Sequence, residues 1–266
     1  MAAHAEPPPV VCWNHLLKQA CTYGRHCKRE HLSLDDPALG RVRLGTAHGE
    51  LEPRALGNAL RSARHPTDVI LCVRHWVSQM DKMHIGSAWH KIGDLLKGAR
   101  TRSEWVDEHA PTLARLRERT LALVPECEPR QLSNIVHGAA HARVDADDVF
   151  DAVAAAALGD GRGSAVRFEP VNVAQTAWAF ATVGRAAPAL FDALAHVSEL
   201  QLDYFDSQEL AMTAWAFATT DARCLSLVAA LTRQLLTARV ELEPSSMRLV
   251  HAFSEWCARE LRLPEA

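Results

Sequence analysis

The chain has 266 residues, of which 48% are hydrophobic and 23% charged, a composition typical of globular proteins. This length allows one large core, or a repeat array with a small appendage. No apolar run approaches the roughly 20 residues that cross a bilayer, so we expect no membrane association. The seven cysteines form no C-x-x-C pair, which favours a reducing compartment. The N-terminal sequence resembles neither a secretory signal nor a transit peptide, so we expect a cytoplasmic or nuclear protein.

The formal net charge of −3 is unevenly distributed along the chain. Residues 1–105 carry 15 Lys and Arg against 10 Asp and Glu, a net charge of +5. Residues 106–266 carry 14 against 22, a net charge of −8. This asymmetry favours binding of a polyanion at the N-terminal half and disfavours a nucleic-acid footprint along the whole chain.

After a tail at residues 1–9, predicted to be disordered, four potential zinc ligands follow at fixed spacings. Eight residues separate Cys12 from Cys21, five separate Cys21 from Cys27, and three separate Cys27 from His31. Three thiolates and one imidazole make a closed tetrahedral set, which is typical of a structural Zn²⁺ site. So short a segment has no core of its own, and metal binding would supply its folding energy, roughly 10–16 kcal/mol in zinc-finger peptides. The alternative is four unrelated residues in a disordered tail.

The spacing C-x8-C-x5-C-x3-H, with the inner sequence Cys21-Thr22-Tyr23-Gly24, resembles the CCCH zinc fingers of the tristetraprolin kind over residues 10–31, and we expect the finger domain to span residues 10–33. The resemblance implies that the finger grips single-stranded RNA by stacking bases on aromatic and cationic side chains. Tyr23 matches one stacking aromatic, and Arg29 occupies the position of the other, where a guanidinium can also stack on a base. The residues expected to face RNA are Trp13, Lys18, Tyr23, Arg25, Lys28 and Arg29. Contact with protein is the alternative role of this surface.

Residues 34–50 are predicted to be a linker, because Pro37, Gly40, Gly45 and Gly49 interrupt any helix. Beyond it the chain repeats itself. The sequence at 168–182, Phe-Glu-Pro-Val-Asn-Val-Ala-Gln-Thr-Ala-Trp-Ala-Phe-Ala-Thr, recurs 37 residues later at 205–219. Further copies are at 127–141 and 242–253, and degenerate ones at 51–60 and 83–92. Such periods are typical of paired-helix arrays, so we predict an all-α protein with an α-solenoid of about five to six helical hairpins over residues 51–266.

Each repeat is expected to be two helices. Val173, Ala177 and Phe180 share one face of the first helix, which Gly184 ends, and Pro188 begins the second helix. We expect Trp178, Trp215, Phe180 and Phe217 to fill the seams between repeats. The apolar stripe of the second helix is Leu190, Phe191, Leu194, Val197 and Leu200.

The element Val/Leu-Ala-x-Thr-Ala-Trp-Ala-Phe-Ala-Thr resembles octotricopeptide repeats and the repeats of FAST-kinase-like proteins, over residues 127–266 better than over 51–126. This resemblance implies an α-solenoid that binds or organises RNA, and residence in an organelle, although no targeting segment is seen. We predict no catalytic residue: His137 and His141 are interpreted as core residues, and Asp145, Asp147, Asp148 and Asp151 as capping residues of a second helix. The sequence thus predicts a zinc-dependent RNA-binding protein of post-transcriptional RNA regulation or processing, with a protein-interaction scaffold as the alternative.

Overall fold

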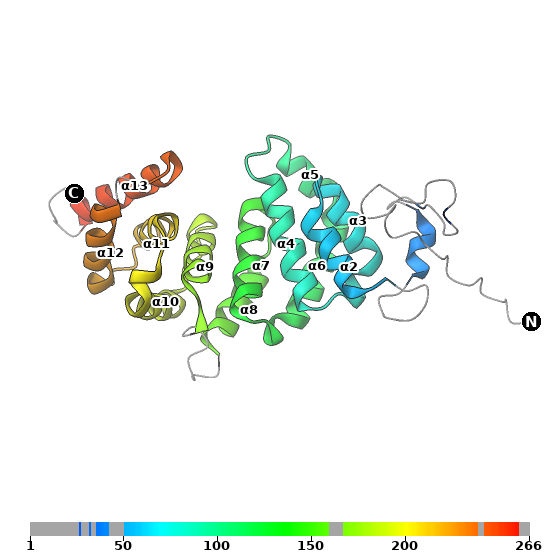
Figure 1. The fold of residues 1–266 in the computed structure, drawn as a ribbon, viewed down its shortest axis with the longest axis horizontal. Coiled ribbons are helices and arrows are strands. Elements are labelled where there is room, and N and C mark those ends of the chain that lie inside the picture. Colours follow the sequence, from blue (N-terminus) through cyan, green and yellow to red (C-terminus); the bar gives the residue numbers. More distant parts are fainter. Residues whose placement is uncertain are drawn as a thin grey trace, which may run out of the picture.

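A computed structural model describes residue 27, residue 32 and residues 36–42, 51–159, 167–238 and 242–260. Within these residues the chain is all-helical and contains no strand, which confirms the predicted all-α class. The α-helices form two layers (Figure 1). The first layer consists of α2 (Pro53–Ser62), α4 (Lys82–Leu96), α7 (Pro129–Ala142), α9 (Pro170–Thr182), α11 (Ser207–Thr219) and α13 (Pro244–Glu260). The second consists of α3 (Pro66–Trp76), α6 (Ala110–Leu123), α8 (Asp147–Leu158), α10 (Pro188–Gln201) and α12 (Leu225–Ala238), while the short α5 (Arg102–Glu108) precedes α6.

Helices pack in chain order within each layer, so the stack runs from α2 and α3 at one end to α12 and α13 at the other (Figure 1). In the first layer α2 packs on α4, α4 on α7, α7 on α9, α9 on α11, and α11 on α13. In the second layer α3, α6, α8, α10 and α12 follow one another in the same way. Each repeat therefore buries its apolar faces against its neighbours, as a hairpin with too little core of its own must do.

Helix starts are marked in the sequence by proline and by a polar residue at the third helical position. Proline lies in the first turn of α7, α9 and α10, where its missing N–H has no helical partner to lose. In four first-layer helices the side chain at the third position accepts a hydrogen bond from the backbone N–H of the residue that precedes the helix. These acceptors are His84, Gln131, Asn172 and Glu209. The third helical position therefore has the same capping role in each of these four helices.

The seam between the layers contains the phenylalanines that the repeat predicted. Phe180 and Phe217 are buried, and they meet Phe150 and Phe191 edge to face with ring centroids 5.0 and 5.2 Å apart. Gly184 follows the end of α9 with a positive φ of 69°, and Pro188 begins α10, both as predicted. The prediction for Leu200 is wrong: it is 63% exposed, because it lies on the outer face near the end of α10.

The helices α4 and α7 cross with backbone against backbone. A Cβ built on Gly138 would lie 2.1 Å from the carbonyl oxygen of Trp89, and one on Gly93 would lie 2.6 Å from Gly138. Neither helix can carry a side chain here, since backbone faces backbone. The two glycines therefore set the distance between these helices, and larger residues would force them apart.

Residues 36–42, in the predicted linker 34–50, form a docked segment. Pro37–Arg41 is a 3₁₀ helix, η2, capped by the Asp36 carboxylate, which accepts from the Ala38 N–H at 2.8 Å. Leu39 and Val42 are buried, and the Val42 carbonyl accepts a hydrogen bond of 3.0 Å from the indole N–H of Trp76 in α3. The segment is therefore part of the core at the α2–α3 end of the stack.

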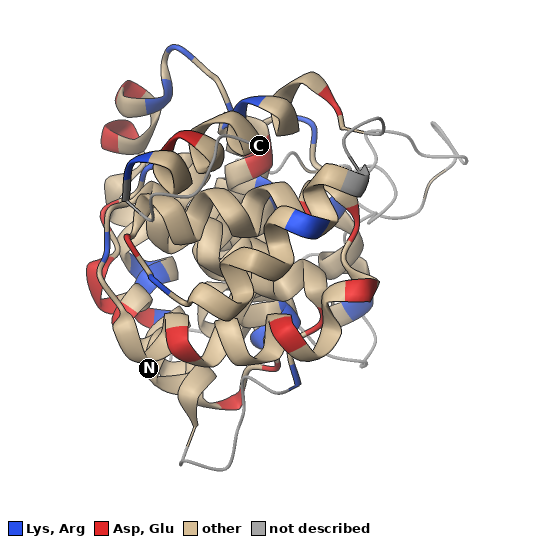
Figure 2. Ribbon diagram, turned by 90° about the vertical axis from the view of Figure 1, so that its left-hand side faces the viewer, with Lys and Arg blue, Asp and Glu red and all other residues tan. Residues whose placement is uncertain are grey.

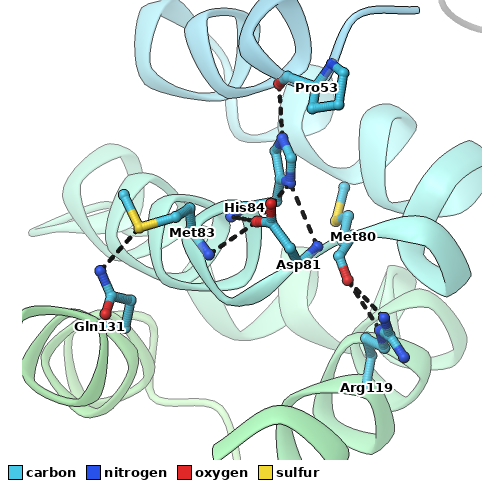
Figure 3. A network of polar contacts seen from close by, with 7 residues as sticks. All are labelled: Pro53, Met80, Asp81, Met83, His84, Arg119 and Gln131. Atoms are coloured by element: carbon cyan, nitrogen blue, oxygen red, sulfur yellow. Dashed lines mark hydrogen bonds and ion pairs between the residues drawn. The ribbon is translucent and has the colours of Figure 1, made fainter. Parts of the chain in front are cut away.

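A buried histidine fastens the start of α4 to the neighbouring helices (Figure 3). The Nε2–H of His84 donates to the Pro53 carbonyl of α2 at 2.7 Å, since that oxygen can only accept, and Nδ1 lies 2.7 Å from the Asp81 carboxylate. Arg119 of α6 donates two bonds to the Met80 carbonyl, at 2.8 and 3.0 Å. This network ties α2, α4 and α6 together.

None of the described helices is long and apolar enough to cross a membrane.

Candidate functional site

The predicted zinc ligands lie almost entirely outside the described residues. This holds for Cys12, Cys21 and His31, and for the predicted RNA-facing residues Trp13, Lys18, Tyr23, Arg25, Lys28 and Arg29. Cys27 is described; it is half-buried and is not part of a disulfide, so its thiol suits a metal ligand. Leu32, the residue after His31, packs against the buried core of the helical stack. Three or more His, Cys, Asp or Glu placed to hold a metal are not found in the described part of the chain.

The clearest arrangement of chemical groups among the described residues is a row of rings across the first layer, at one equivalent position of successive helices. We call His90 (α4), His137 (α7), Trp178 (α9) and Trp215 (α11) the aromatic column. Neighbouring ring centroids are 6.2, 5.1 and 6.5 Å apart in that order. His90 is exposed and the other three are half-buried. The prediction that Trp178 and Trp215 fill the seams thus holds only in part, because their rings also reach the surface.

A second histidine packs against the aromatic column near its centre. His141, one turn after His137, packs on His137 at 4.5 Å and on Trp178 at 4.3 Å between ring centroids. Burial lowers the pKa of His137 to about 3 and that of His141 to about 4, with Lys97 among the cations that add to the effect. The pKa of His90 is also lowered, because neighbouring atoms displace part of the water around its ring although its side chain is exposed. At neutral pH these rings are uncharged and serve as flat, weakly polar surfaces.

Polar groups without protein partners lie beside the aromatic column. The side-chain amides of Asn134 and Gln175, each three residues before a column ring, are half-buried and make no hydrogen bond with the described residues. The indole N–H groups of Trp178 and Trp215 likewise find no acceptor there, whereas those of Trp76, Trp89 and Trp256 each do. Donors and acceptors on this face are therefore available to a ligand.

Cations without acidic partners flank the same face. Lys97, Arg130 and Arg248 are exposed, and their side chains form no ion pair or hydrogen bond with the described residues. Lys97 follows α4, Arg130 begins α7 beside His90, and Arg248 lies in α13. Nearby acids are engaged in helix caps: Asp206 accepts from the Glu209 N–H at 2.7 Å, and Glu209 accepts from the Asp206 N–H at 2.9 Å. The two carboxylates keep their negative charge, so cations and acids lie beside the column together.

Acidic residues instead occupy one edge of the first layer, where its helices begin. Each acid stabilises the positive end of a helix dipole, and several accept hydrogen bonds from the first turn. The edge lies about 13–14 Å from the aromatic column along a helix, since a rise of about 1.5 Å per residue applies over the nine positions from Glu169 to Trp178. We call these residues the acidic edge: Glu52, Asp81, Glu128, Glu169, Asp206 and Glu243. Seen along the stack, charged residues lie around its outside and the middle is uncharged (Figure 2).

A groove of about 400 Å³ is lined by some of these groups. Its walls come from α7, α9, α11 and α13 and from Lys97, so it crosses the first layer over four helices. His137, His141 and Trp178 line it together with the apolar side chains of Met212 and Leu249. Gln175 and Arg248 line it as well. The groove therefore offers flat rings, apolar side chains, amides and cations, together with the carboxylates of Asp206 and Glu209.

Three acids of the cluster around α8 form ion pairs with arginines. Asp148 forms an ion pair of 2.6 Å with Arg117, which holds the pKa of this carboxyl below its ordinary value. Arg185 pairs with Asp147 at 2.8 Å and also with Asp151. These acids stabilise the first turns of α8, as expected, but the residue that caps the helix is Ala146 and not an aspartate.

The surface position of the aromatic column was not foreseen, although a signal for it exists. In each repeat the residue three positions before the ring has a polar or flexible side chain. The first helix of a repeat packs against a neighbouring helix on each side, so only a strip on its outer face stays exposed.

A comparison of the chain with protein-family models and with curated proteins found no match in either.

Proposed function

We propose that this is a non-enzymatic, zinc-dependent RNA-binding protein, in which a CCCH finger at residues 10–33 grips single-stranded RNA beside an α-solenoid. The observation that carries the proposal is the spacing C-x8-C-x5-C-x3-H together with Tyr23-Gly24. Four ligands at three fixed spacings are a specific signature, and the surrounding residues are basic. The protein would act in the cytoplasm or nucleus, in RNA regulation or processing.

Zinc would be held by Cys12, Cys21, Cys27 and His31. Bound there, it would supply the energy that folds the finger, and the closed ligand set leaves no position for an activated water. Tyr23 and Arg29 would stack on bases, each stack contributing roughly 1–3 kcal/mol. Lys18, Arg25 and Lys28 would contact phosphates, in keeping with the net charge of +5 over residues 1–105.

Two features support a division of labour between the finger and the helical stack. Leu32 packs on the core, and Val42 is hydrogen-bonded to Trp76 of α3, which fixes residues 36–42 to the α2–α3 end. The acidic edge and the net charge of −8 over residues 106–266 disfavour RNA along the rest of the stack. RNA would therefore bind at the finger end, and the stack would extend the surface or recruit partners.

The test is RNA binding by the full chain over a range of salt concentrations. A labelled single-stranded RNA should bind with a slope of log K against log salt of about −0.7 for each phosphate contacted, so about −2 to −3 for three or four cations. Tyr23→Ala with Arg29→Ala should weaken binding at least tenfold, whereas Arg100→Ala, an exposed cation of the stack, serves as the matched control. A slope near zero, or binding that the double variant leaves unchanged, would reject the proposal.

A protein-interaction scaffold is the second candidate, and the groove over α7, α9, α11 and α13 favours it. In that case the finger would also contact protein. Cross-linking in cells separates the two: the RNA-binding protein yields RNA cross-links that Cys21→Ser removes. A scaffold yields no such cross-links and is recovered with a stoichiometric protein partner.

A further inference from the structure

We propose that one exposed flank of α12 is the contact surface of a homodimer, in which it packs antiparallel against the same flank of a second copy of this chain. The flank, which we call the α12 stripe, consists of Leu225, Ala229, Thr232 and Leu236. It lies at the end of the stack opposite α2 and α3 (Figure 1). The inference does not depend on whether the finger binds RNA.

The position of α12 in the second layer leaves one of its flanks without a neighbour. The helices α6, α8 and α10 each pack between two other helices of that layer. In the described part of the chain α12 is the last second-layer helix, and it packs against α10 and against α11 of the first layer. Helices of a stacked array are built to meet a neighbour on either side, so the open flank of α12 is where a further helix would pack.

The repeat shows that the α12 stripe belongs to this open flank. α10 begins at Pro188 and α12 begins at Leu225, 37 residues later, so Glu199 of α10 corresponds to Leu236 of α12. Glu199 accepts a hydrogen bond from the Ser226 hydroxyl of α12, which places Glu199 on the flank of α10 that faces the next helix. Leu236 therefore lies on the equivalent flank of α12, where the next helix is absent from the described chain.

The α12 stripe is apolar and exposed. Its members follow one another at intervals of four, three and four residues, which is the spacing of a helix–helix seam. Leu225 is 64% and Leu236 is 53% exposed, and Ala229 between them is exposed as well. Thr232 donates its hydroxyl to the Val228 carbonyl at 2.9 Å, so it adds no unpaired donor. By contrast, α3, α6 and α8 expose no large hydrophobic side chain.

The order of side chains in the α12 stripe selects a second copy as its occupant. Their sizes read large, small, small, large in both directions, and Leu225 and Leu236 lie equally far from the midpoint. A two-fold axis through that midpoint makes the two helices antiparallel, so Leu225 of each copy meets Leu236 of the other. Ala229 then meets Thr232, and these small side chains allow the helix axes to approach closely. None of the four side chains is charged, so no like charges oppose the pairing.

The length of the α12 stripe sets the strength of the dimer. The eleven steps from Leu225 to Leu236 span about 16 Å at a rise of about 1.5 Å per residue. One helix pair of this length buries less than the roughly 800 Å² per partner of a standard interface, so we expect a transient dimer with a dissociation constant of about 1 µM or weaker. Two copies joined here form one longer stack with an α2–α3 end at each extremity.

The experiment is sedimentation-velocity ultracentrifugation of the full chain under reducing conditions, from about 1 µM to about 1 mM. The wild type should pass from monomer to dimer as its concentration rises. Leu236→Glu, which the dimer contains twice, should weaken association about tenfold or more. Leu200→Glu is the matched control, because Leu200 is 63% exposed in α10 and lies outside the α12 stripe. The control should change the dissociation constant less than about twofold, and circular dichroism checks that each variant is folded.

Mixtures of charged variants test the antiparallel packing. Leu225→Lys and Leu236→Glu should each dimerise poorly alone, because each sets a charge against a leucine of the other copy. Mixed together, they should associate about tenfold more tightly than either does alone, because one contact becomes an ion pair and the other remains a pair of leucines. A mixture of Leu225→Lys with Leu225→Glu should show no such gain, since antiparallel packing keeps these two positions apart.

Three results would overturn the inference. They are a wild type that stays monomeric at every concentration, a dimer that Leu236→Glu weakens no more than Leu200→Glu does, and a mixture of Leu225→Lys with Leu225→Glu that associates more tightly than Leu225→Lys with Leu236→Glu. The first result would leave the α12 stripe to a helix of another protein, and the third would make the packing parallel. Cys21→Ser separates this inference from the proposed function, since it should abolish RNA binding and leave the dissociation constant of the dimer within about twofold.

Discussion

Replacing Gly138 with alanine should destabilise the protein, because the backbone of α4 occupies the space for a methyl group. The new Cβ would lie 2.1 Å from the Trp89 carbonyl oxygen, 2.3 Å from its carbon and 2.8 Å from the His90 nitrogen, whereas ordinary contact begins at 3.4 Å. All three atoms are backbone, so no side chain can rotate away and the two helices must separate. Overpacking of this kind costs about 1–3 kcal/mol or more, against a gain of about 0.5–1 kcal/mol from replacing a helical glycine.

The measurement is urea denaturation followed by far-ultraviolet circular dichroism, with Gly57→Ala as the matched control. Gly57 lies in α2, and the nearest atom to its new Cβ is the end of the flexible Arg61 side chain at 3.4 Å. The control should be as stable as the wild type or up to about 1 kcal/mol more stable. A Gly138→Ala protein as stable as the wild type would refute the close crossing of α4 and α7.

Two further predictions concern single contacts. Trp76→Phe removes the hydrogen-bond donor to the buried Val42 carbonyl and should lower the free energy of unfolding, measured in urea, by about 1–3 kcal/mol. Trp256→Phe, whose acceptor Asp221 is exposed, is the control and should lower it by less than about 1 kcal/mol. Equal losses in the two variants would contradict the docking of residues 36–42. Because the pKa values of His137 and His141 fall from 6.5 to about 3 and about 4 on folding, the unfolded chain binds more protons below a pH of about 6.5. The free energy of unfolding should therefore be at its full value above that pH and fall as the pH drops toward 4, and His137→Asn with His141→Asn should flatten that fall. An unchanged slope in the double variant would show that other groups cause it.

The repeat pattern predicted much of the helical layout because its signals are local. Pro188 begins α10 and Gly184 follows the end of α9, since proline and glycine act on the backbone at their own position. Phe180 and Phe217 lie in the seam because the 3.6-residue period identifies the apolar face. Local chemistry and periodicity were sufficient at these positions.

Other features depend on contacts between distant residues. Val42 docks through a tryptophan 34 residues away, so Pro37 and Gly40 alone predicted only a linker. The packing of neighbouring helices determines the close crossing at Gly93 and Gly138 and the surface exposure of the Trp178 and Trp215 rings. The hydrophobic period of a single helix does not reveal such packing. The finger, by contrast, is predicted from ligand spacing alone, and it stays a prediction, as does the α-solenoid class of the stack.

The proposal that a zinc-bound finger holds RNA is tested most directly by measuring zinc and RNA binding on the same purified samples of the full chain. The account predicts one zinc per chain in the wild type, no zinc and no RNA binding in Cys21→Ser, and the same helical signal in both, because the stack has its own core. Wild-type protein without stoichiometric zinc, or Cys21→Ser protein that still binds RNA with unchanged affinity, would contradict it.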